Sequence, residues 1–186
     1  MAGLDGRSME PNNLKWAVYS VVLALVAACG VLDWRTRRIP NALTIPAIGA
    51  GLALHALSDG GAGLAFSAKG LALGAGLFFV PYYLGGMGAG DVKLMGAVGA
   101  LLGWRMTLIA LFYTALAGGL CAVFVMLRAR AVKSSFTRMD TMFRLLFANK
   151  RFPAADTIQG RSVTIPYALP VALGTAAALL LGSPLG

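Results

Sequence analysis

Apolar segments of membrane-spanning length follow one another along most of this 186-residue chain. A helix that crosses a bilayer needs about 20 consecutive, mostly apolar residues. Hydrophobic residues make up 58% of the chain and charged residues only 12%, whereas soluble domains average roughly half apolar and a quarter charged. A soluble fold of this size has too small an interior to bury so much apolar surface. The sequence therefore predicts an all-α membrane protein.

Six apolar segments are expected to span the membrane, all within a single integral membrane domain, residues 1–186. They are residues 16–32, 39–57, 63–84, 92–103, 106–127 and 165–181. The fourth is short. It is separated from the fifth because residues 92–127 are too many for one span and are interrupted at Gly103-Trp104-Arg105. A polar tail, residues 1–15, precedes the first segment. The pattern predicts a bundle of six transmembrane helices.

The basic residues predict the orientation of this bundle, since cytoplasmic loops carry an excess of Lys and Arg. The first connection contains Arg35, Arg37 and Arg38, and the fifth, residues 128–161, contains eight basic residues. Six spans place connections one, three and five on the same side. The N-terminus is therefore expected outside the cytoplasm, and Asp91, in the third connection, on the cytoplasmic side. A multi-pass membrane protein fits this arrangement.

The net charge of +9 is expected to face anionic lipid headgroups, because the basic residues lie beside apolar segments. No nucleic-acid partner is predicted. Within residues 128–161, apolar and basic side chains alternate with a spacing that favours an amphipathic helix in the headgroup region. The alternative is a short soluble helix packed on the other cytoplasmic loops.

Two of the seven acidic residues stand out by their position. The other five fall in the polar tail, in an external turn or in the basic loop, where solvation explains them: Asp5, Glu10, Asp59, Asp140 and Asp156. Asp33 and Asp91 each lie where an apolar span meets the cytoplasmic face. Ionisable groups at such positions are costly and suggest function. The competing interpretation is a helix-end carboxylate paired with a neighbouring Arg or Lys.

The sequences around both aspartates are distinctive. Asp91 ends a glycine-rich run, Gly85-Gly86-Met87-Gly88-Ala89-Gly90, which disfavours a helix and leaves backbone groups free to pair with a peptide. Asn41, after Ile39-Pro40, would cap the second span or contact a substrate. Lys93 would tune Asp91, hold a substrate carboxylate, or extend its amine to the headgroups.

Metal and disulfide chemistry have little support in the sequence. Cys29 and Cys121 lie in different apolar stretches without CxxC spacing, and His55 is the only histidine. We expect no metal and no cofactor. Glycines at the spacings Gly70-x-x-x-Gly74 and Gly99-x-x-x-Gly103 predict close helix packing.

The segments Asp33-Trp34-Arg35-Thr36-Arg37-Arg38-Ile39-Pro40-Asn41 and Gly88-Ala89-Gly90-Asp91-Val92-Lys93-Leu94 resemble the two signature segments of the type 4 prepilin peptidase family. The second contains the GxGD motif of membrane aspartyl proteases. The greatest similarity is to the short CpaA/TadV-like members that serve tight-adherence (Flp-type) pilus systems. The resemblance extends from about Trp16 to Leu127.

This resemblance implies that Asp33 and Asp91 are the catalytic pair. They would remove leaders from prepilins or pseudopilins at the cytoplasmic face of the bacterial inner membrane. Gly88 and Gly90 would shape the loop. Larger members carry a cytoplasmic insertion with paired CxxC motifs, linked to zinc and to N-methylation. Because this sequence has no such pairs, we expect proteolysis without methyl transfer.

Two other functions compete with this one. A small cation- or proton-coupled transporter would use the aspartates as a binding site, but transporter sites usually lie near the midplane, and both aspartates are predicted at one face. A non-catalytic pilus assembly scaffold would need neither aspartate. A peptidase with the same dyad and preflagellin or signal-peptide substrates is a related alternative.

Overall fold

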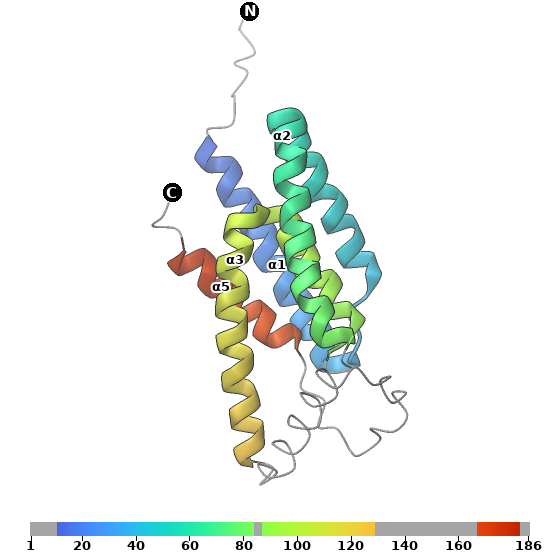
Figure 1. Ribbon diagram of the computed structural model, residues 1–186, viewed down its shortest axis with the longest axis vertical. Helices are drawn as coiled ribbons and strands as arrows, with labels where there is room; N and C mark the ends of the chain where they lie inside the picture. The colour runs from blue at the N-terminus through green and yellow to red at the C-terminus, as the bar shows by residue number, and fades with distance from the viewer. Residues whose placement is uncertain (1–10, 84–86, 129–166, 183–186) are drawn as a thin grey trace, which may run out of the picture.

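The computed structural model describes residues 11–83, 87–128 and 167–182 (Figure 1). These residues form four helices: α1 (Pro11–Thr36), α2 (Asn41–Tyr83), α3 (Ala89–Arg128) and α5 (Ala168–Leu181). No strand occurs among them, so the all-α prediction is confirmed. Helix α1 begins at Pro11, ahead of the predicted first span, because proline suits the first helical turn. The predicted basic, amphipathic loop, residues 128–161, lies almost entirely outside the described residues.

The two longest helices are each interrupted once. Helix α2 leaves helical geometry at Asp59 and Gly60, and α3 leaves it at Gly103. Both glycines have positive φ, 57° and 72°, a conformation that costs glycine nothing and other residues more. Figure 1 shows each helix folded back at this point into two arms. The arms of α2 contact one another near this turn. Their approach is so close that a Cβ added at Gly63 would collide with the carbonyl of His55.

The prediction of six separate transmembrane helices is not supported. Three helices are long and apolar enough to cross a membrane, namely Lys15–Thr36, Asn41–Tyr83 and Ala89–Phe124. Helix α5 is apolar but shorter, with 14 residues. The predicted loops at residues 58–61 and 103–105 are sharp turns of only one or two non-helical residues. The structure thus has four helices in its described part, two of them broken at the expected places.

Glycines bring α2 and α3 into backbone contact. A Cβ at Gly51 would lie 2.7 Å from the backbone of Ala100, and Gly70 and Gly99 face one another so closely that a Cβ on either would collide with the other's carbonyl. Such approaches let membrane helices gain van der Waals contact. The predicted close packing is confirmed at Gly70 and Gly99, and also at Gly74, where a Cβ would collide with the carbonyl of Met95.

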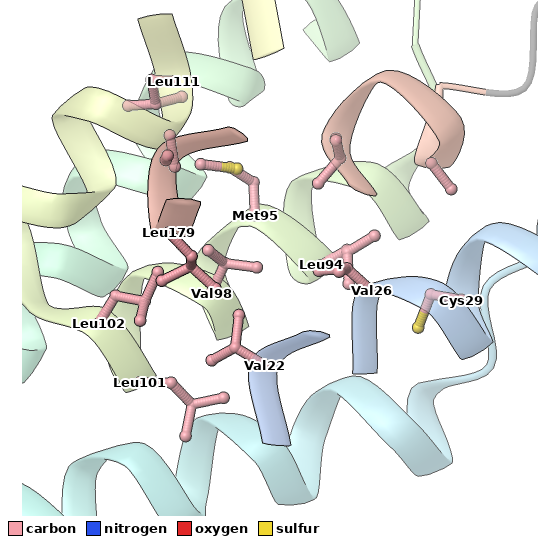
Figure 2. Close-up of a cluster of buried hydrophobic side chains, with 14 of the residues drawn as sticks. Val22, Val26, Cys29, Leu94, Met95, Val98, Leu101, Leu102, Leu111 and Leu179 are labelled. Atoms are coloured by element: carbon pink, nitrogen blue, oxygen red, sulfur yellow. The ribbon is translucent and has the colours of Figure 1, made fainter. Parts of the chain in front are cut away.

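The apolar centre of the bundle is formed mostly by side chains of α1, α3 and α5, with Phe78 from α2. Figure 2 shows Val22 and Val26 of α1 gathered with Leu94 and Val98 of α3 and Leu179 of α5. All five are at most 6% exposed. This centre fixes α1 and α5 against the first arm of α3, which also carries Asp91.

Two polar side chains of α2 bond to carbonyls just before the break in α3. Ser67 Oγ donates to the carbonyl of Ala100 at 2.7 Å, and His55 Nε2 lies 3.1 Å from that of Leu101. A helix break removes the N–H groups that these carbonyls would otherwise meet, and a lipid environment offers no water in their place. His55 is therefore a packing and hydrogen-bonding residue of the bundle.

Candidate active site

The structure brings Asp33 and Asp91 together. Asp33 lies in the last turn of α1 and Asp91 in the first turn of α3, and Figure 1 shows these helix ends at the same end of the bundle. Their side chains are 8% and 6% exposed, and the charge of Asp33 acts on the carboxyl of Asp91. Asp91 Oδ1 has no hydrogen-bond partner among the described residues, which weighs against a helix-end ion pair through this oxygen.

A tight turn after Asp33 directs the chain into α2. The backbone N–H of Arg37 donates to the carbonyl of Asp33 at 2.9 Å, and Arg37 has a positive φ of 53°. Thr36 Oγ1 lies 2.8 Å from the carbonyl oxygen of Leu32 and 3.1 Å from that of Arg38. These contacts end α1 at Thr36, and α2 begins five residues later, at Asn41.

The glycines before Asp91 let its helix begin against this turn. A Cβ at Gly90 would lie 2.9 Å from the Cβ of Ile39, so glycine is needed for the two signature segments to touch. The backbone N–H of Gly88 donates to Asp91 Oδ2 at 3.3 Å, while Asp91 N–H donates to the Gly88 carbonyl at 3.1 Å. Such reciprocal hydrogen bonds, between the residue before a helix and the third residue of the helix, are typical of a capped helix N-terminus.

The two oxygens of Asp91 differ in their surroundings. Oδ2 accepts the hydrogen bond from Gly88, whereas Oδ1 is buried and accepts none from the described residues. A buried carboxylate oxygen without a donor is costly. Such an oxygen is suited to a water or substrate group that enters the site.

Asn41 and Lys93 bind each other across the site. Lys93 Nζ donates to Asn41 Oδ1 at 3.0 Å, which ties the first residue of α2 to the start of α3. Sequence analysis offered separate roles for the two side chains and missed this pairing. Exposure of the bond to solvent limits its strength.

Tyr167 is a further site residue that sequence analysis missed. It precedes the first residue of α5, and its phenol interacts electrostatically with Asp91. Among the described residues no group of three His, Cys, Asp or Glu side chains gathers as metal ligands.

Long apolar helices with two interacting, buried carboxyls at one end define a helical membrane protein with a paired-carboxylate site. The model of the type IV leader peptidase family matches residues 20–123, and the chain belongs to this family. That segment contains Asp33, Asn41, Gly88, Gly90, Asp91 and Lys93.

Two curated relatives share the same name. The prepilin leader peptidase/N-methyltransferase of Bacillus subtilis (strain 168) is 31% identical over 116 residues, which cover 61% of this chain and 46% of that protein. The protein of the same name from Escherichia coli (strain K12) is 31% identical over 115 residues, 58% of this chain and 51% of its own length. The chain thus spans about half the length of the curated relatives it matches. No solved structure matches it.

Proposed function

We propose that this chain is an aspartic endopeptidase that removes the leader from prepilin or pseudopilin substrates, with Asp33 and Asp91 as the catalytic pair. The observation that carries the proposal is the convergence of these two buried carboxyls from separate signature segments. Membership of the leader peptidase family supports the substrate class. We propose that residues 1–186 act as one peptidase domain without a cofactor.

The chemistry follows from two carboxyls that share one proton, because like charges a few Å apart cannot both ionise cheaply. The ionised carboxyl takes a proton from water, whose oxygen attacks the carbonyl carbon of the scissile peptide bond. The protonated carboxyl donates its proton to the carbonyl oxygen, which gives a neutral gem-diol. Collapse of this intermediate breaks the C–N bond, protonates the leaving amine and returns one proton to the pair. The pair titrates as a unit, so the proton belongs to both.

The breaks in α2 and α3 support a six-segment topology as a proposal. Counting each arm separately, the chain has α1, two arms of α2, two arms of α3 and α5. If each segment crosses, the ends of α1 and of α3 share one side, as Figure 1 indicates. These ends carry Arg35 and Arg128, which by the positive-inside rule supports a cytoplasmic side for both aspartates. We propose that the membrane is the bacterial inner membrane. The N-terminus would lie outside, and the basic loops beside anionic lipid.

The absence of paired CxxC motifs from this sequence narrows the proposed activity. The two relatives are named for both leader peptidase and N-methyltransferase activity. We propose the peptidase activity alone for this chain. The similarity to short family members favours a substrate from a tight-adherence (Flp-type) pilus.

Co-expression with a candidate prepilin tests the proposed function. Mass spectrometry of the pilin should show a new N-terminus at the end of the leader, without a methyl group. A methylated terminus would contradict the narrower proposal. A transporter would instead give ion flux across sealed vesicles and leave the pilin uncleaved, and a scaffold would give neither.

Gly90→Ala should lower cleavage about tenfold or more, because the added Cβ would lie 2.9 Å from the Cβ of Ile39 and push the two signature segments apart. Misplacing reacting groups by about 1 Å costs on the order of 100-fold. The comparison is Gly76→Ala, where nothing lies within 4 Å. Equal processing rates for the two variants would show that close contact at Gly90 is not required.

Lys93→Met and Asn41→Ala should each lower cleavage about fivefold, since a hydrogen bond of this kind contributes about 1 kcal/mol. The double variant should be no worse than either single variant, because both remove the same bond. Lys69→Met, at an exposed lysine of α2, is the control. Multiplicative losses in the double variant would mean that the two side chains act separately.

A further inference from the structure

The start of α5 lies against the part of α1 that carries Asp33. Gly30 precedes Asp33 by one helical turn, and a Cβ at Gly30 would lie 3.8 Å from the Cβ of Ala172 and 3.9 Å from the carbonyl oxygen of Ala168. Ala168 is fully buried. Packing thus fixes the first turn of α5 beside the end of α1.

Tyr167 occupies the position just before this first turn. Its backbone is helical, with φ −68° and ψ −20°, and its carbonyl accepts a hydrogen bond from the N–H of Val171 at 3.2 Å. The fully buried Val171 holds the turn in the apolar centre. The half-buried Tyr167 side chain is therefore presented by a rigid element and not by a free end.

The phenol of Tyr167 is close enough to Asp91 for the charge of that carboxylate to act on it. Asp91 Oδ1 is the oxygen that lacks a donor. The other groups that act on Asp91 are the charge of Asp33, from α1, and the N–H of Gly88. Lys93, two residues further along α3, bonds to Asn41 of α2. The proton of Asp33 belongs to the pair and Lys93 already donates to Asn41, so among the side chains named here the phenol is the further donor available to Oδ1.

We propose that Tyr167 is a positioning residue of the aspartate pair, whose hydroxyl stabilises the charged form of Asp91 in the free protein and donates a hydrogen bond to it in the substrate complex. Hydrogen bonds at active sites are often long without substrate and shorten when it binds. A donated bond fixes the orientation of the carboxyl and favours its charged form. The expected loss of cleavage rests on the proposed function, whereas the expected effect of Tyr167 on the protonation of Asp91 does not.

Tyr167→Phe tests the inference by removing the hydroxyl alone. We expect cleavage to fall about tenfold or more, the size expected for a hydrogen bond to a charged group, mainly through kcat with KM little changed. The acid limb of the rate profile should move to higher pH, because the charged form loses a stabilising donor. The control is Tyr19→Phe, on α1 far from its Asp33 end. A Tyr167→Phe enzyme with wild-type kcat and an unmoved acid limb would overturn the proposal.

A second readout does not need cleavage. A carbodiimide modifies protonated carboxyls, and mass spectrometry of the purified protein can follow its reaction with Asp91 as a function of pH. Labelling of Asp91 should persist to higher pH in Tyr167→Phe than in wild type or Tyr19→Phe. Identical labelling curves would reject the inference even if the wild-type protein cleaves nothing. If Tyr167→Phe does not accumulate, 3-fluorotyrosine at this position, a stronger donor, should shift the curve to lower pH; an unshifted curve would reject the inference.

Discussion

Asp33→Asn and Asp91→Asn should each abolish leader cleavage, with a loss of at least about 10³-fold. An asparagine amide can neither take a proton from water nor share one with the remaining carboxyl. The change is nearly isosteric, so the folded structure should persist. The measurement is the fraction of co-expressed prepilin that is processed, normalised to the amount of peptidase in the membrane.

Asp59→Asn is the matched control for both variants. Asp59 is exposed and lies at the break of α2, where the proposed mechanism assigns it no role. The Asp59→Asn enzyme should therefore process prepilin at the wild-type rate. Full processing by either Asp33→Asn or Asp91→Asn would contradict the two-carboxyl mechanism.

Gly70→Val should destabilise the bundle by about 3 kcal/mol, near the upper end for overpacked positions. A Cβ at Gly70 would collide with the carbonyl of Gly99 and lie 2.8 Å from the backbone of Gly103. These neighbours are backbone atoms, which cannot rotate away as a flexible side chain would. Thermal unfolding in detergent, followed by size-exclusion chromatography, should show a much lower midpoint or loss of the folded protein.

Gly76→Val provides the comparison within the same arm of α2. Nothing lies within 4 Å of a Cβ at Gly76, and the change in helix propensity is the same. Its unfolding midpoint should stay close to that of the wild type. If the two valine variants unfolded alike, close packing of α2 on α3 would not be a main source of stability.

The position of the aspartate pair could be predicted from the sequence because simple rules apply to it. Asp33 and Asp91 stand at ends of apolar segments, and basic residues mark which ends share a side. The glycine pairs of α2 and α3 were likewise predictable, since small residues at a four-residue spacing favour close packing. The structure places both aspartates at one end of the bundle, while their cytoplasmic side and catalytic role stay predictions.

Other features depend on geometry that a linear pattern does not contain. Hydropathy located both interruptions, at Gly60 and Gly103, but it could not distinguish a loop from a turn within one long helix. The bond between Lys93 and Asn41 joins residues on different helices. The approach of Tyr167 to Asp91 arises from how α5 packs on α1 and α3, which no local motif records.

A cross-link between positions 33 and 91 tests the central claim most directly. Asp33→Cys and Asp91→Cys would be combined in a chain in which Cys29 and Cys121 are replaced by alanine, and a short bis-reactive thiol reagent would be applied in membranes. The account predicts rapid intramolecular cross-linking, and none when Asp33→Cys is combined instead with Arg105→Cys, just past the break at the far turn of α3. Monofunctional thiol reagents would show that both cysteines are accessible. If the 33–91 pair then failed to cross-link, the claim that the two aspartates lie together would be contradicted.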